Sequence, residues 1–121
     1  MPSRGIRGAT TVTENTVSAV EEATIELLKT ILKKNSVDIE SISHVIFTLT
    51  KDLNAVFPAK FAREELGWDA VPMMCVNEAD VEGSLTFCIR VLIVVNTDKV
   101  QSELMHVYLR DAKKLRSDLS E

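Results

Sequence analysis

Cysteine and histidine are scarce in this 121-residue sequence, which has two of each. Cys75 and Cys88 form no C-x-x-C pair, and His44 and His106 stand far from them and from each other. A structural zinc site needs about four such ligands at short spacings, so the sequence argues against a metal site. Two thiols without a disulfide framework indicate a reducing compartment.

Long apolar runs and blocks of basic residues are also missing. No stretch reaches the length that spans a bilayer, and the N-terminal residues have no apolar signal core. The formal net charge is −4, and the longest basic grouping, residues 113–116, is interrupted by a leucine. Nucleic acids and anionic membranes attract basic surfaces, so neither is expected as a partner. The expected location is the cytoplasm.

The most informative segment is a run of β-prone apolar residues, 87–95, with one charge at Arg90. Branched aliphatic residues at this density predict an interior strand that is buried on both faces. A buried guanidinium without a partner costs several kcal/mol, so Arg90 needs one. The partner is either an internal carboxylate, Glu78 or Asp80, or a ligand, and the local sequence leaves both open.

A second arginine, Arg7, lies in another strand-like segment, residues 4–12. Side chains alternate along a strand, so Gly5 and Ala9 lie beside Arg7 on the same face. Such small neighbours leave open space around the guanidinium, as contact with a ligand requires. An equal alternative is that the glycines relieve strand twist or mark a bulge.

The rest of the chain predicts two helices and three further strands. Asn15 or Thr16 is the expected N-cap of the first helix, and Asn35 is expected to end it in a left-handed conformation. The order β-α-β-α-β-β-β predicts one α/β (α+β) domain over residues 1–121, with a mixed sheet and helices packed on one face. The predicted elements are helices over 16–35 and 58–67 and strands over 41–50, 71–76 and 106–109.

Three polar side chains, Arg7, Arg90 and Tyr108, are predicted to point away from the aliphatic faces of their strands. Two permanent cations and a phenol suit a small, oxygen-rich anion, because guanidinium groups bind carboxylates in a bidentate fit. The sequence has neither a glycine-rich phosphate loop before a helix nor a recognisable Ser-His-acid set. Cys75 is more readily explained as a packing residue than as a nucleophile.

Five short motifs occur in one register along the chain. They are RGIRGATTV at 4–12, DLNAVFPAK at 52–60, CIRV at 88–91, HVYL at 106–109 and LRSDL at 115–119. Together they resemble the small α/β class of monofunctional, AroH-like chorismate mutases, from about residue 4 to residue 119. Met73 and Met74 depart from the smaller or β-branched residues that this family often has there.

The resemblance implies a trimeric pseudo-barrel, with active sites at the subunit boundaries of a homotrimer. It also implies conversion of chorismate to prephenate without a metal or cofactor. By position, Arg90 lies at the ether oxygen of the breaking bond, and Glu78 lies at the ring hydroxyl. The implied substrate-binding residues are Arg7 and Tyr108 at a carboxylate; Met74, Cys75, Val76 and Asn77 along the pocket, with Cys75 hydrogen-bonded near Glu78; Phe57 and Arg63 from a neighbouring chain; and Arg116, with Leu115, on a mobile tail of residues 112–121.

Two other function classes fit the residues when they are taken alone. A non-catalytic trimeric binder of a small carboxylate metabolite would use the same cations. A structural or protein-interaction module would keep Arg7 and Arg90 as internal ion pairs. The joint presence of Arg7, Glu78, Arg90 and Tyr108 favours the enzyme over both alternatives.

Overall fold

The computed structural model describes residues 1–115. Within this part of the chain, five strands and two α-helices follow one another in the order predicted from the sequence. They are β1 (Ser3–Thr11), α1 (Val17–Asn35), β2 (Ile42–Leu49), α2 (Pro58–Glu65), β3 (Met73–Asn77), β4 (Cys88–Asn96) and β5 (Val107–Tyr108). Short 3₁₀ helices form at Ile39–Ser41, Gln101–Glu103 and Arg110–Lys114.

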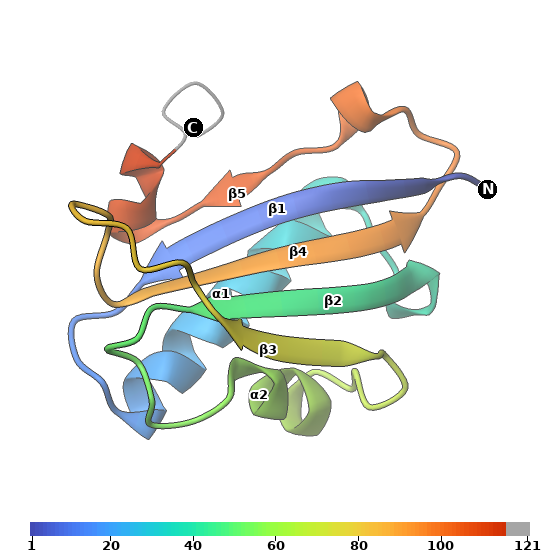
Figure 1. Ribbon diagram of the computed structural model, residues 1–121. Helices are drawn as coiled ribbons and strands as arrows, with labels where there is room; N and C mark the ends of the chain where they lie inside the picture. The colour runs from blue at the N-terminus through green and yellow to red at the C-terminus, as the bar shows by residue number, and fades with distance from the viewer. Residues whose placement is uncertain (116–121) are drawn as a thin grey trace.

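The strands form one mixed sheet in the order β3-β2-β4-β1-β5 (Figure 1). The central strand, β4, is antiparallel to its neighbours β1 and β2, whereas the edge strands β3 and β5 pair in parallel with β2 and β1. Helix α1 runs behind the sheet in the view of Figure 1, and α2 lies beside β3 at the lower edge. Helix α2 packs against α1 and β3, and its Ala59 and Ala62 belong to the same core. The predicted α/β fold with helices on one face is confirmed. Among residues 1–115, no helix combines the length and the apolar character of a membrane span.

The first helix packs closely on β1 because an apolar stripe meets a glycine. Leu27 and Ile31 of α1 are fully buried, and a Cβ at Gly8 of β1 would come within 2.6 Å of Ile31 Cδ1. A glycine at this position therefore sets how near the helix lies to the sheet. The helix begins after Thr16, whose side chain accepts a hydrogen bond from the Ala19 N–H at 3.2 Å.

The C-terminal end of α1 differs from the prediction. Ser36, not Asn35, adopts the left-handed conformation, with φ of 51°. Asn35 stays helical and buried because its side chain bonds inward. Its Nδ2 donates to the carbonyls of Ile31 and Met105, both at 2.9 Å, and its Oδ1 accepts from the Met105 N–H at 2.7 Å. These bonds tie the end of α1 to the segment that precedes β5.

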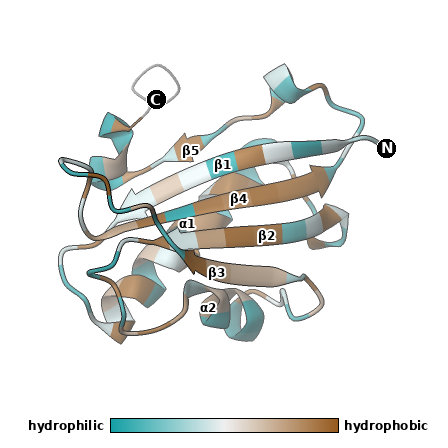
Figure 2. Ribbon diagram, in the orientation of Figure 1, coloured by the Kyte–Doolittle hydropathy of each residue, from teal (hydrophilic) through white to brown (hydrophobic). Residues whose placement is uncertain are grey.

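The two faces of the sheet differ in what covers them. The face toward the helices is apolar, and Phe47 and Ile93 are fully buried there. On the opposite face Leu92 is 39% exposed and Arg90 is half-buried. The prediction that residues 87–95 are buried on both faces is therefore wrong for the single chain, because the helices cover one face only. Yet β2 and β4 are hydrophobic along most of their length (Figure 2), so apolar side chains also reach the open face.

Candidate active site

A cavity of about 580 Å³ lies on the open face of the sheet. Its charged lining consists of Arg7 from β1, Arg90 from β4, and Glu78 from the residue after β3. Tyr108 of β5 adds a phenol, and Leu92 of β4 adds apolar surface. A mostly apolar cavity with a few convergent polar groups is the usual form of a small-molecule site.

The pairing of three strands brings the arginines and the tyrosine together. Ala9 of β1 lies opposite Arg90 of β4 and opposite Tyr108 of β5. Arg7 comes two residues before Ala9, so its side chain points to the same face of the sheet. The pairing of β1 with β4 is continuous, so the glycines beside Arg7 do not mark a bulge. The small side chain of Ala9 packs beneath Tyr108 and leaves room for the larger polar groups.

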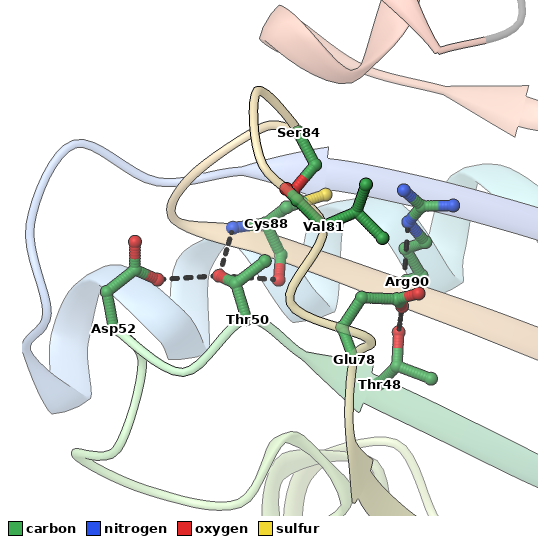
Figure 3. A network of polar contacts seen from close by, with 8 residues as sticks. All are labelled: Thr48, Thr50, Asp52, Glu78, Val81, Ser84, Cys88 and Arg90. Carbon is green, nitrogen blue, oxygen red and sulfur yellow. Dashed lines mark hydrogen bonds and ion pairs between the residues drawn. The ribbon is translucent and has the colours of Figure 1, made fainter.

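Arg90 has an internal carboxylate partner and also faces the cavity. Its Nε lies 3.6 Å from Oε2 of Glu78 (Figure 3), an ion pair that is too long for a hydrogen bond. This buried Nε makes no hydrogen bond to any of residues 1–115. Asp80, the other predicted partner, pairs with Lys51 at 2.8 Å on the exposed loop. Arg90 therefore has both an internal carboxylate partner and access to a ligand, because its ion pair with Glu78 is too long to occupy the guanidinium fully.

Glu78 is held from both ends by consecutive residues of β2. Its backbone N–H donates to the Leu49 carbonyl at 2.8 Å, and its Oε2 accepts a hydrogen bond from the Thr48 hydroxyl (Figure 3). Thr48 and Ile46 both line the cavity, although the sequence pattern predicted neither as a site residue. They become site residues through their place opposite Arg90 and Leu92 on the neighbouring strand, which no local pattern in β2 reveals.

A second polar network fixes the turn that leads into β4 (Figure 3). Both carboxylate oxygens of Asp52 accept from the Phe87 N–H, at 3.1 and 3.0 Å, and Oδ1 accepts from the Thr50 hydroxyl at 2.6 Å. Phe87 has φ of 49°, a left-handed conformation that costs a non-glycine residue about 1–2 kcal/mol. Asp52 offsets this strain and so helps to place Arg90, three residues further along. Burial raises the pKa of the neighbouring Cys88 thiol, although the charge of Arg90 opposes the change.

Comparison with known proteins agrees with this geometry. The family model for chorismate mutase type I matches residues 3–119. This chain belongs to the chorismate mutase type I family. It is 46% identical over 120 residues to chorismate mutase AroH of Bacillus subtilis (strain 168), and this match covers 99% of this chain and 94% of the relative. It is 49% identical over 117 residues to chorismate mutase AroH of Thermus thermophilus, and this match covers 96% of this chain and 95% of that relative. The solved chorismate mutase from Clostridium thermocellum Cth-682 matches with a TM-score of 0.88 and 50% identity, over 91% of this chain and 97% of that chain.

In this chorismate mutase family member, β3 gives fewer side chains to the cavity than the motifs implied. Met74 and Val76 point to the open face and are 64% and 41% exposed, but the cavity lining does not include them. Asn77 is the last residue of β3, is exposed, and pairs with Leu49 of β2. These residues lie beside the cavity, at the edge of the sheet.

The side chain of Cys75 lies on the other face, contrary to the expectation that it contacts Glu78 in the pocket. It packs against the core beneath the helices. Burial raises the pKa of the thiol, and a backbone hydrogen bond with Ala59 and the charge of Arg63 oppose that rise. Alternation along β3 explains the difference, because Met74 and Val76 occupy the open face and Cys75 lies between them.

Phe57 and Arg63 do not line the cavity of their own chain. Phe57 immediately precedes α2 and is 67% exposed, and Arg63 is exposed on α2. Leu115 lines the cavity, as the motifs implied, whereas Arg116 falls outside the described residues.

Proposed function

We propose that this chain is a chorismate mutase, an isomerase that converts chorismate to prephenate in phenylalanine and tyrosine biosynthesis. The observation that carries the proposal is the cavity, in which two guanidinium groups, a phenol and one carboxylate face a partly apolar space in a member of this family. The rearrangement is intramolecular: one C–O bond breaks as one C–C bond forms. The protein therefore has to fold the substrate and stabilise charge, and it needs no nucleophile or proton relay.

Arg7 and Tyr108 are the proposed carboxylate-binding residues. They lie on neighbouring strands, β1 and β5, and both line the cavity. A guanidinium and a phenol side by side can donate to the two oxygens of one carboxylate. Leu92 and Ile46 offer apolar surface to the hydrocarbon part of the substrate. Holding the substrate so that its reacting carbons approach each other can supply several kcal/mol of the acceleration.

Arg90 is the proposed catalytic cation. As the C–O bond breaks, partial negative charge builds up on the ether oxygen, and a fixed guanidinium there binds the transition state more tightly than the ground state. Because the ion pair between Glu78 Oε2 and Arg90 Nε is 3.6 Å long, the guanidinium is already oriented but not neutralised by a close pair. Losing one such preorganised donor typically costs about 10²–10³ in rate.

Glu78 is the proposed partner of the ring hydroxyl and of the positive charge that develops on the ring. Its carboxylate lines the cavity, and its side chain is 23% exposed. One oxygen, Oε2, is engaged by Thr48 and Arg90. The other oxygen is then the acceptor for the substrate hydroxyl. Main-chain groups of Met74, Cys75, Val76 and Asn77 would complete this side of the site.

We further propose a homotrimer with active sites at the subunit boundaries. Met74, Val76 and Leu92 leave apolar surface exposed on the open face of the sheet, which a neighbouring chain would bury. Phe57 and Arg63 would then contribute to the rim of a neighbour's cavity. The proposal explains why neither residue lines the cavity of its own chain.

The trimer proposal predicts that activity depends on assembly. Dilution until sedimentation shows monomers is expected to abolish turnover, because each cavity loses the residues supplied by its neighbour. The measurement is the rate per chain across the same concentration series. Monomers with undiminished activity would contradict a shared site.

We also propose that the chain acts as a single domain in the cytoplasm. The family match spans residues 3–119, which supports one domain. Cys75 and Cys88 are both unpaired, which suits a reducing compartment.

The direct test of the activity is an assay with purified protein and chorismate. Loss of chorismate absorbance with formation of prephenate supports the proposal. If chorismate raises the melting temperature without being consumed, the protein is instead a carboxylate binder of the second kind considered above. If chorismate neither reacts nor binds, the cavity serves a different ligand.

A further inference from the structure

We propose that Thr48 is a positioning residue. Its hydroxyl holds the Glu78 carboxylate beside Arg90 and prevents a close, two-point ion pair between the two side chains. The inference rests on the proposed mutase function and assigns a residue to that site that the sequence motifs did not mark. Thr48 acts through Glu78, since its hydroxyl donates to Oε2 of that residue.

The location of Thr48 makes this contact specific. In the sheet, Thr48 of β2 lies opposite Arg90 of β4 on one side and opposite Val76 of β3 on the other. Its side chain therefore stands between the strand that carries the catalytic cation and the strand that leads to Glu78. The next residue, Leu49, accepts the Glu78 N–H at 2.8 Å. Two consecutive residues of β2 thus fix Glu78 at its backbone and at its carboxylate.

The contact also explains the long ion pair. Oε2 of Glu78 accepts a hydrogen bond from the Thr48 hydroxyl and lies 3.6 Å from Arg90 Nε. A carboxylate without the hydroxyl would be free to rotate and form a closer, two-point pair with the guanidinium, which arginine geometry favours. Such a closed pair would neutralise the cation and remove the second oxygen from the substrate. Thr48 therefore keeps both catalytic groups available.

The test uses Thr48→Val, which keeps the branched shape and removes the hydroxyl, and Thr48→Ser, which keeps the hydroxyl. We expect Thr48→Val to lower kcat about 10- to 100-fold, the range for losing a hydrogen bond to a charged group. KM should change less than about threefold, because carboxylate binding by Arg7 and Tyr108 is not altered. Thr48→Ser is expected to restore most of kcat. Thr48→Ala serves as a second hydroxyl-free variant if Thr48→Val folds poorly.

Thr30→Val is the matched control. The Thr30 hydroxyl donates to the Glu26 carbonyl at 2.7 Å on α1, away from the cavity, so this variant makes the same chemical change elsewhere. Its kcat should equal that of the unmodified protein. Melting temperatures of all variants show whether any loss of activity comes from unfolding.

A double-mutant cycle separates positioning from a direct role. If Thr48 acts through Glu78, then Thr48→Val should have little further effect on kcat in a Glu78→Ala background. Three results would overturn the proposal for Thr48: unchanged kcat in folded Thr48→Val or Thr48→Ala, equal losses in Thr48→Ser and Thr48→Val, or the full loss repeated in the Glu78→Ala background. Failure of the unmodified protein to consume chorismate would instead overturn the proposed function, and the assignment of Thr48 with it.

Discussion

Two arginines in this chain meet carboxylates in different ways. Arg110 is engaged along its whole guanidinium: Nη1 donates to the Thr11 carbonyl at 3.1 Å, and Nη2 and Nε lie 3.5 and 3.3 Å from Glu22 and Glu26 of α1. Arg90 forms one longer ion pair, 3.6 Å between its Nε and Oε2 of Glu78, and it lines the cavity.

The difference separates a structural cation from one that is available for chemistry. Arg110 holds the segment after β5 against β1 and α1, and it does so from a left-handed backbone with φ of 53°. Such strain persists where surrounding contacts determine the conformation. Arg90 is oriented by one acid and left open toward a ligand. What decides the role of each arginine is how much of the guanidinium its own chain engages.

The largest expected effect comes from Arg90→Lys. Turnover should fall by about 10²–10³, because an ammonium is shorter and lacks the planar fork that reaches both Glu78 and the ether oxygen. The fold should be retained, as circular dichroism and the melting temperature would show. A near-normal kcat in this variant would contradict the proposed catalytic role of Arg90 and its contrast with Arg110.

The next largest effect concerns the acid beside Arg90. Glu78→Ala is expected to lower kcat about 100-fold and Glu78→Gln only about 10-fold, since glutamine keeps an acceptor for the ring hydroxyl and for Thr48. The two variants are compared in the same chorismate assay. Equal activities for them would mean that the Glu78 side chain has no role as an acceptor.

Arg110→Met should affect stability and spare the chemistry. Methionine keeps the apolar stem and removes the contacts to Thr11, Glu22 and Glu26, and the expected loss in the free energy of unfolding is about 1 kcal/mol, since the glutamates are well exposed to solvent. Denaturant melts measure that loss. The kcat should stay within about threefold of the unmodified protein. A fall in kcat as large as that of Arg90→Lys would break the comparison.

The smallest expected effect is a change in melting temperature at a pair of carboxyl groups, Glu65 and Glu21, that has no arginine partner among residues 1–115. A hydrogen bond with Glu21 raises the pKa of Glu65, and partial desolvation and the charges of Glu21 and Glu64 add to the rise, which Lys29 opposes. A raised pKa means that the pair stabilises the fold at low pH and loses that contribution as pH rises through the pKa. Glu65→Gln should therefore raise the melting temperature slightly at about pH 7 and leave it unchanged at about pH 4. Equal shifts at both pH values would contradict this linkage.

Alternation and apolar periodicity were sufficient to predict the elements of the fold and the faces of Arg7 and Arg90. They placed five strands and two helices in the correct order because each element carries its own pattern. They did not predict that one face of β4 stays open, because strand composition reports how apolar a face is and not which chain covers it. They also assigned the left-handed helix end wrongly to Asn35. The side chain of Asn35 forms inward hydrogen bonds to Ile31 and Met105, and these bonds depend on the tertiary fold, which no local pattern reveals.

The candidate site shows the same limit more clearly. Arg7, Glu78, Arg90 and Tyr108 were predicted and are brought to one cavity. Thr48 and Ile46 were missed because cross-strand pairing alone makes them neighbours of those residues. Leu92 needed no such pairing, since it follows Arg90 by two residues and therefore lies on the same face of β4. The position of Asp52 at the strained Phe87 was missed for a similar reason, since the two residues are distant in sequence.

The most direct test of the account replaces the charge of Arg90 and nothing else. A synthetic segment of residues 88–121 begins with Cys88 and can be ligated to residues 1–87, which allows Arg90→citrulline, a neutral side chain of nearly the same shape. The measurement is kcat for chorismate at saturation. The account predicts a loss of at least about 10², because the shape remains and the charge at the ether oxygen is gone. A kcat equal to that of the arginine protein would show that charge at position 90 does not drive the rearrangement.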